Sequence, residues 1–200
     1  MKLSIDADSF NTGVNACTKI LNSYKDISRP VLTYICIRVL SSSSSSIKPH
    51  VEMCAVNGYS GIRVLIANAV VLSRQPDDDY HEILIDPNVL EKAQAGTTVC
   101  IDDSGDNVTI EYTHKYSRKT ASHEKVAGPY VDIDRIFFKH ADGDFSCFAV
   151  NPKYLKGVVD AMTDNKYLQF EVHGSTDPII IRGSGDDLTS EIALILPIRL

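Results

Sequence analysis

Hydrophobic and polar residues alternate along most of this 200-residue chain, as they do in half-buried antiparallel strands. This period of two predicts about a dozen strands and only three helices. The first helix is expected directly after the strand KLSI, where Asp6 can accept hydrogen bonds from the free N–H groups of the first turn. Its apolar stripe, at helical spacing, consists of Phe10, Val14, Cys17 and Leu21.

Two further helices are predicted where an Asp or Asn precedes a proline. Asp86 and Asn151 can cap a helix, and the prolines that follow them have no N–H group to satisfy in the first turn. The stripe of the second helix is Val89, Leu90 and Ala93, and Gly96 is its expected end. The stripe of the third helix is Tyr154, Leu155, Val158, Val159 and Met162.

Each predicted helix follows one strand and precedes three, so the chain contains an internal repeat of strand, helix and three strands. The repeating units span 1–72, 80–126 and 145–200. We expect the first two units to form one domain, residues 1–126, with 127–144 as a connector and 145–200 as a separate third unit. The predicted fold class is α+β, with antiparallel sheets that carry their helices on one face.

The composition is typical of a folded protein outside membranes. Hydrophobic residues make up 44% of the chain, but no apolar run approaches the roughly 20 residues of a membrane-spanning helix. The start MKLSIDADSF becomes polar too early for a signal peptide, and the five cysteines include no C-x-x-C pair. We therefore expect a cytoplasmic protein with reduced thiols, no disulfide and no membrane partner.

Motifs that carry chemistry are weak in this sequence. The stretch 102–107, DDSGDN, has neither the glycine position nor the acidic spacing of a calcium loop, and a hairpin turn is the better interpretation. The stretch 183–188, GSGDDL, lacks the third glycine of a phosphate-binding loop. The acidic run 77–79 and the serine run 41–46 are interpreted as solvated loops. No metal and no cofactor are expected, although an active site assembled from distant residues stays open as an alternative.

The repeat, the [DN]-P-x-x-L helix starts and the terminal LILPIRL together resemble the bacterial DNA polymerase III beta subunit, the DNA sliding clamp. The opening MKLSIDADSFNTGVNACTKILNS and the following SRPVLTYICIRV are similar to the first helix and the next strand of that family. The resemblance implies a DNA-clamp-like fold made of half-domain units. It also implies a shortened variant, because this chain has three units where family members have three domains of two units each.

The resemblance implies that the polar helix faces contact the phosphates of double-stranded DNA loosely enough to slide. The candidate DNA-binding residues are Lys19, Lys25, Arg29, Lys92, Lys153 and Lys156. The alternative for each is an ordinary solvated lysine or arginine, because the net charge of −6 gives no general affinity for nucleic acid.

The resemblance also implies a hydrophobic pocket near the chain end that receives short peptides from DNA polymerases and clamp loaders. Its candidate residues are Pro178, Leu194, Leu196, Pro197 and Ile198. The alternative is a last core strand whose leucines pack inward.

The functional hypothesis is thus a non-enzymatic processivity or recruitment factor. A clamp-derived decoy that binds clamp partners without encircling DNA is the second hypothesis, and a nuclease-like enzyme is the third. A homo-oligomer would suit the first hypothesis and a monomer the second.

Overall fold

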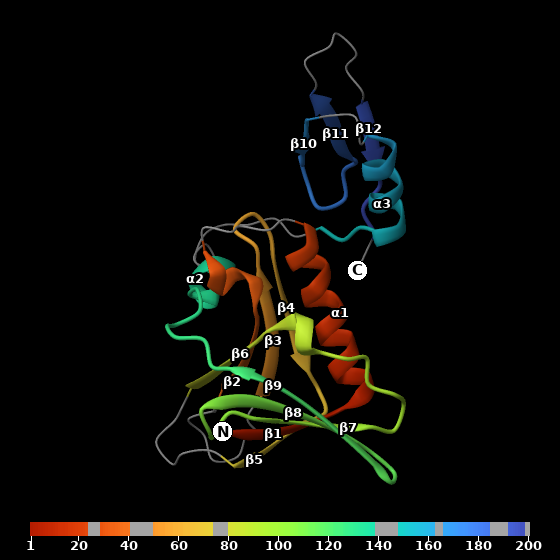
Figure 1. Ribbon diagram of the computed structural model, residues 1–200. Coiled ribbons are helices and arrows are strands. Elements are labelled where there is room, and N and C mark those ends of the chain that lie inside the picture. The colour runs from red at the N-terminus through yellow and green to blue at the C-terminus, as the bar shows by residue number, and fades with distance from the viewer. Residues whose placement is uncertain are drawn as a thin grey trace. The chain divides into compact units, whose positions relative to one another are not determined.

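The computed structural model describes most of the chain (Figure 1). The described residues are 1–23, 29–40, 50–73, 80–138, 148–162, 166–184 and 192–198. They belong to two compact bodies, an N-terminal body from Met1 to Ile136 and a C-terminal body from Phe137 to Leu200. Lys25, the serine run 41–46 and the acidic run 77–79 lie outside the described residues.

The described part of the N-terminal body is built on two antiparallel sheets. Its strands are β1 (Lys2–Asp6), β2 (Ile35–Leu40), β3 (His50–Val56), β4 (Gly61–Ile66), β5 (Ala69–Ser73), β6 (Tyr80–Ile85), β7 (Thr98–Asp102), β8 (Asn107–His114) and β9 (Ser117–Glu124). Its helical elements are α1 (Ala7–Ser23), the 3₁₀ turns η1 (Pro30–Thr33) and η2 (Pro87–Val89), and α2 (Ile133–Phe138) at its end. The β1 sheet has the order β5-β1-β7-β8-β9, and the β2 sheet has the order β4-β3-β2-β6. The predicted α+β class, with antiparallel sheets and few helices, is confirmed.

The first two sequence units are joined by an exchange of strands. Strand β1, which opens the first unit, pairs with β7 of the second unit in a register that includes Lys2 opposite Asp102. Strand β6, which opens the second unit, pairs in the same antiparallel manner with β2 of the first, with Ile35 opposite Ile85. Each unit therefore occupies a sheet edge that the other would leave open.

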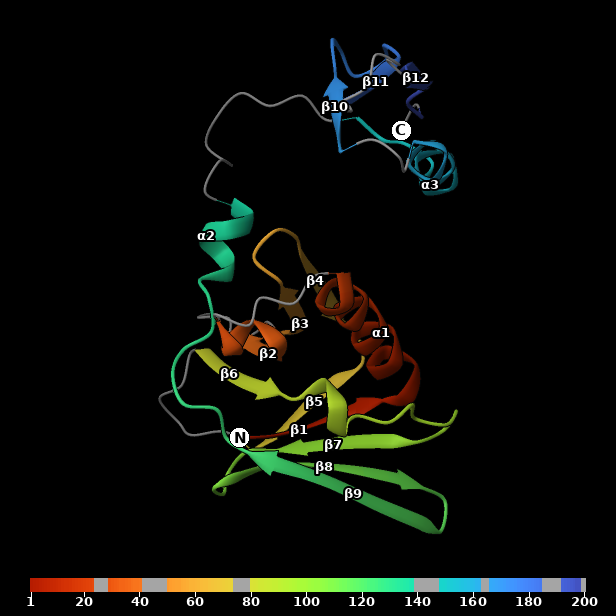
Figure 2. The same ribbon diagram turned by 45° about the horizontal axis from the view of Figure 1, so that its top comes forward.

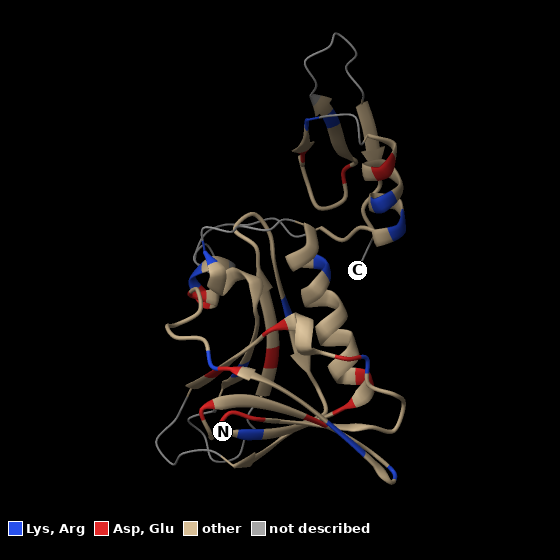
Figure 3. Cartoon of the chain, in the orientation of Figure 1, with Lys and Arg blue, Asp and Glu red and all other residues tan. Residues whose placement is uncertain are grey.

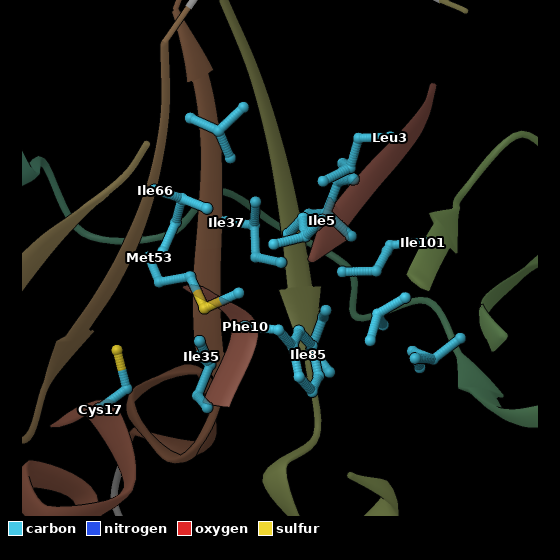
Figure 4. Packing of buried hydrophobic residues seen from close by; sticks show 14 of the residues in the cluster. Leu3, Ile5, Phe10, Cys17, Ile35, Ile37, Met53, Ile66, Ile85 and Ile101 are labelled. Carbon is cyan, nitrogen blue, oxygen red and sulfur yellow. The ribbon is translucent and has the colours of Figure 1, made fainter. Parts of the chain in front are cut away.

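The main core of the N-terminal body lies between the two sheets and α1 (Figure 4). The alternation of the strands explains it, because Leu3 and Ile5 of β1 point inward while their neighbours do not. Of the predicted α1 stripe, Phe10, Cys17 and Leu21 are buried and Val14 packs against them. The predicted cap is also present, since the Asp6 carboxylate accepts the N–H groups of Asp8 and Ser9, each at 3.0 Å. The first helix is therefore confirmed.

The second predicted helix is wrong in extent. The Asp86 side chain does accept the Asn88 N–H at 2.8 Å, but only the short 3₁₀ turn η2 follows, and the backbone is extended again at Leu90. The next N–H groups find partners outside the segment: that of Glu91 donates to the Tyr112 hydroxyl at 3.0 Å. Tertiary hydrogen bonds thus replace the bonds that would have continued a helix.

The expected connector also differs from the structure. Its first part, residues 127–136, packs on the outer face of the β2 sheet, where Tyr130 and Ile133 are buried against Leu32, Cys36 and Leu84. The Tyr130 hydroxyl accepts the Val56 N–H at 3.1 Å. The N-terminal body therefore extends about ten residues past the predicted limit at 126.

The C-terminal body contains α3 (Pro152–Ala161) and the β11 sheet, a three-stranded antiparallel sheet. Its strands, in spatial order, are β10 (Tyr167–Glu171), β11 (Ile179–Ser184) and β12 (Ile192–Ile195). The third predicted helix is confirmed, and the Asn151 side chain caps it by accepting the Lys153 N–H at 2.9 Å. Its described core is small. The buried residues are Met162, Ile179, Ile181 and Ile195.

Candidate nucleic-acid and peptide interfaces

Two of the predicted DNA-binding lysines lie on one side of the N-terminal body. Lys19 is exposed on the polar face of α1, and Lys92 is exposed in the segment that follows η2. The Asn11 side chain of α1 holds this segment through Ala93: it donates to the carbonyl oxygen at 2.8 Å and accepts from the N–H at 2.9 Å. The structure therefore fixes Lys92 beside the first half of α1, although it does not place Lys92 on a helix.

The polar face of α1 is not strongly basic. Its exposed residues include Asp8, Thr12, Asn15, Lys19 and Asn22. In Figure 3 basic and acidic residues are interspersed along the elements of this body. A DNA contact on this side would thus rest on a few cations rather than on a continuous positive patch.

The other predicted DNA-binding residues that the structure describes lie on different elements from Lys19 and Lys92. Arg29 is exposed immediately before η1, and Lys153 and Lys156 are exposed on α3 in the C-terminal body. Lys156 forms an ion pair with Asp160 one turn later, which neutralises part of its charge. All of these DNA-binding assignments stay predictions.

A cavity of about 180 Å³ lies next to Lys92, where the segment after η2 crosses β8 and β9. It is lined by Tyr112, His114 and Lys119 among others. Lys119 forms an ion pair with Glu91 at its rim. The sequence pattern did not indicate this cavity, because it predicted a helix where the segment is extended.

The side chains of Leu194 and Leu196 do not pack into the described core of the C-terminal body. Along β12 and beyond it, Ala193 and Ile195 point to the inner face, whereas Leu194 and Leu196 are 57% and 63% exposed. Ile192 shares the outer face and is 58% exposed. Ile192 is not among the predicted pocket residues, although the same period of two places it on this face. The exposed residues Ile192, Leu194 and Leu196 are called the β12 strip below.

The other predicted pocket residues lie at the same end of the β11 sheet. Ile179 pairs with Ile195, so the register carried one residue further brings exposed Pro178 opposite Leu196. Pro197 is half-buried, and the Ile198 N–H donates to the Ala149 carbonyl oxygen at 2.7 Å. This hydrogen bond fixes the chain after β12 against the residues that precede α3.

The buried thiols are poor nucleophiles. Burial raises the pKa of Cys17 to about 12 and that of Cys54 to about 11, so both stay protonated at neutral pH. Within the described ranges, no group of three His, Cys, Asp or Glu side chains is arranged to hold a metal ion. The helices there are also too short or too polar to cross a membrane.

Solved structures with the same fold include several bacterial sliding clamps. The C. crescentus beta sliding clamp has a TM-score of 0.69 and 10% sequence identity over 98% of this chain and 50% of the clamp chain. The Pseudomonas aeruginosa DNA polymerase sliding clamp has a TM-score of 0.68 and 11% identity over 98% and 51%. The beta subunit of the Streptococcus pyogenes DNA polymerase has a TM-score of 0.51 and 14% identity over 97% and 53%.

These likenesses confirm the predicted resemblance at the level of the fold. The chain spans about half the length of the clamp chains it matches. No protein-family model matches the sequence, and no curated protein matches it either.

Proposed function

We propose that this chain is a non-enzymatic, sliding-clamp-like processivity or recruitment factor. It contacts duplex DNA through Lys19 and Lys92 and binds short polymerase or clamp-loader peptides at the β12 strip. The observation that carries the proposal is the combination of a clamp fold over 98% of the chain with an apolar strand face that the fold leaves exposed.

The weak basic character of α1 supports a sliding contact. A protein that slides needs phosphate contacts that are few and not specific for sequence, because each Lys–phosphate contact releases condensed counterions and adds to the affinity. Lys19 and Lys92 supply two such contacts on one side of a body that belongs to an acidic chain. The acidic residues elsewhere repel DNA and restrict it to that side.

The β12 strip supports peptide binding. Isolated apolar side chains are common on protein surfaces, but three that share one strand face, with Pro178 beside them, form a contiguous apolar area. Short peptides bind such areas by burying one or two anchor side chains, which carry most of the binding energy.

A second candidate function is a decoy or regulator that binds clamp partners without encircling DNA. It is favoured by the coverage of only about half of each clamp chain. In this case the β12 strip binds the same peptides, and the lysines have no DNA role.

Retention on end-blocked DNA separates the two functions. The protein is added to a linear duplex, both ends are then blocked with streptavidin, and the salt concentration is raised. An encircling clamp stays on the blocked duplex and slides off the open-ended duplex. A factor that only contacts DNA dissociates from both duplexes, because the added salt restores counterions to the DNA phosphates. A chain that binds the peptides but neither duplex, even at low salt, is a decoy. A chain that binds neither DNA nor the peptides would reject both functions.

A further inference from the structure

The cavity beside Lys92 lies where the chain follows an extended path instead of the predicted helix. The segment ends in a tight turn, in which the Thr97 N–H donates to the Gln94 carbonyl oxygen at 3.0 Å. Gly96 lies inside this turn with a φ of +78°, a left-handed conformation that glycine adopts without strain. The turn brings the Thr97 hydroxyl to 3.5 Å from Nδ1 of His114 on β8. Thr97 and His114 therefore form one side of the cavity.

Two buried hydroxyl groups line this cavity and have hydrogen-bonding capacity to spare. They belong to Tyr112 and Thr97, which are only 8% and 5% exposed. The Tyr112 hydroxyl accepts the Glu91 N–H at 3.0 Å, and no described residue accepts its own proton. The contact of Thr97 with His114 is longer than the roughly 2.7–3.2 Å of a well-formed hydrogen bond. Because buried polar groups in proteins are normally hydrogen-bonded, both hydroxyls can donate to a bound ligand.

The surroundings of the cavity are locally basic. Its lining includes two lysines, Lys92 and Lys119, and one glutamate, Glu91. Glu91 forms an ion pair with Lys119, and none of the described carboxylates pairs with Lys92. Lys115 adds a further positive charge in the adjacent turn between β8 and β9, and Figure 3 shows basic residues toward this end of the hairpin. This part of the surface therefore favours an anion, although the whole chain has a net charge of −6.

The size of the cavity selects a compact anion. Its volume of about 180 Å³ is well below the roughly 300–1,000 Å³ of pockets that enclose a whole drug-sized ligand. It is several times the roughly 30 Å³ that one water molecule occupies in the liquid, so a group of a few heavy atoms can enter. We therefore expect the charged end of a ligand inside the cavity and the rest of that ligand outside it.

A phosphate monoester fits the donors of this cavity better than a carboxylate does. It carries a charge of about −1.5 to −2 at neutral pH, and its three terminal oxygens all accept hydrogen bonds. These oxygens match in number the ammonium of Lys92 and the hydroxyls of Thr97 and Tyr112, whereas a carboxylate has only two oxygens. An internal phosphate of DNA is a diester with a sugar on both sides, so a small cavity favours a phosphate at the end of a molecule.

We propose that this cavity is a binding site for a phosphate monoester. Lys92, Thr97 and Tyr112 bind the phosphate group, and Lys115 and Lys119 add to the positive potential at the rim. Two kinds of ligand carry this group: a DNA strand with a terminal 5′-phosphate and a free nucleotide. The site goes beyond the proposed function, in which Lys92 contacts internal phosphates of duplex DNA and no end of a strand is recognised.

The first test compares a fluorescent single-stranded DNA that carries a 5′-phosphate with the same strand that ends in a 5′-hydroxyl. In anisotropy titrations, the full chain should bind the phosphorylated strand at least about tenfold more tightly, because charge-assisted hydrogen bonds form only with the phosphate. Calorimetry with thymidine 5′-monophosphate and with thymidine distinguishes the two kinds of ligand. A monophosphate that binds as tightly as the phosphorylated strand identifies a free nucleotide, and a strand that binds more tightly identifies a DNA end. No preference for the phosphate in either pair overturns the proposal.

Two substitutions then test the buried hydroxyls. Thr97→Val removes one hydroxyl with no change of charge, and it should reduce the preference for the phosphorylated strand by about tenfold. Tyr112→Phe removes the other hydroxyl and should act in the same direction. The matched control is Thr120→Val, at an exposed threonine of β9 outside the lining, which should keep the wild-type preference. Thermal unfolding checks that each variant is folded. A phosphate preference that survives both Thr97→Val and Tyr112→Phe overturns the proposal.

Failure of this site is distinguishable from failure of the proposed function. Because Thr97 is buried, Thr97→Val should leave unchanged both the affinity for duplex DNA with 5′-hydroxyl ends and its salt dependence. The proposed duplex contact depends instead on Lys19 and Lys92. A chain that binds duplex DNA without a preference for the 5′-phosphate contradicts this site alone. A chain that prefers the 5′-phosphate but has no affinity for duplex DNA contradicts the duplex contact alone.

Discussion

The buried guanidinium of Arg38 on β2 is bound at two points by the carboxylate of Asp134 on α2, with Nη1 3.2 Å from Oδ1. Arg38 is only 1% exposed and also lies 3.4 Å from the Glu52 carboxylate. Burial alone lowers the pKa of Arg38, but hydrogen bonds to Asp134 and Tyr80 outweigh it and raise the pKa above its ordinary value. This ion pair holds residues 127–136 on the outer face of the β2 sheet.

Removing the Asp134 carboxylate should destabilise the N-terminal body. Asp134→Asn leaves the buried Arg38 with less compensating charge, and the free energy of unfolding should fall by about 1–2 kcal/mol, because Asp134 itself is partly exposed. Urea unfolding measures the difference. Glu124→Gln, which removes an exposed carboxylate from β9, should change it by less than about 0.5 kcal/mol. Equal effects of the two substitutions would contradict this role for Asp134.

A methyl group added at Gly13 should also destabilise the protein. The Cβ of an alanine there would lie 2.5 Å from the Met53 sulfur, because α1 packs closely on the β2 sheet at this point. The overpacking should cost about 1–3 kcal/mol, which exceeds the gain in helix propensity. Thermal unfolding of Gly13→Ala and of Thr12→Ala, on the exposed face of α1, makes the comparison. If Gly13→Ala were as stable as wild type, the close packing of α1 on Met53 would be contradicted.

The Asp103 carboxylate should make stability depend on pH in the acid range. Burial raises its pKa, but hydrogen bonds from His81 at 2.7 Å and the Met1 ammonium at 2.6 Å outweigh burial and lower it below the ordinary 3.8. A lowered folded pKa means that this stabilisation is complete above 3.8 and is lost as the pH falls through the folded value.

Asp103→Asn should therefore be less stable than wild type by about 2 kcal/mol at pH 7, and the difference should shrink below pH 3.8. Urea unfolding at a series of pH values measures it, with the exposed Asp106→Asn as the control. A difference between wild type and Asp103→Asn that is the same at all pH values would contradict the assignment.

Lys19 on α1 and Lys92 in the segment beside it should contribute to DNA affinity in an additive and salt-dependent way. If Lys19 and Lys92 each contact one phosphate, replacing both by glutamate should reduce the slope of log K against log salt by about two. Binding of a fluorescent duplex, followed by anisotropy at several salt concentrations, gives the slopes. Lys125→Glu makes the same charge change at an exposed position outside the proposed contact and should affect the slope less. If the double substitution left the slope unchanged, the assignment of these lysines to a DNA contact would be wrong.

Local sequence patterns predicted the elements that are stabilised by contacts between residues close together in the sequence. The Asp6 and Asn151 caps and the α1 stripe all depend on spacings of two to four residues, which the sequence displays directly. The resemblance to sliding clamps rested on the same short signals in repeated order, and the fold confirms it.

The features that were missed depend on contacts between distant residues. The segment after η2 has a helical pattern, but Asn11 and Tyr112 bind its N–H groups from 82 and 21 residues away. In the same way, the expected connector packs on the β2 sheet because Arg38 meets Asp134 at a separation of 96 residues. A window of a few residues around either segment does not include the distant side chain that binds it. The exposed Tyr154 and Val159 were assigned to a core for a similar reason, because apolar spacing does not say which surface covers a helix.

Peptide binding at the β12 strip tests the central claim most directly, because both candidate functions require it. A fluorescent peptide from a bacterial polymerase or clamp loader, titrated with the protein, should bind saturably, and Leu196→Ala should weaken it by about tenfold through loss of a buried contact. Leu72→Ala, at an exposed leucine of β5, should bind as wild type does. No saturable binding to wild type, or equal binding by Leu196→Ala, would contradict the account.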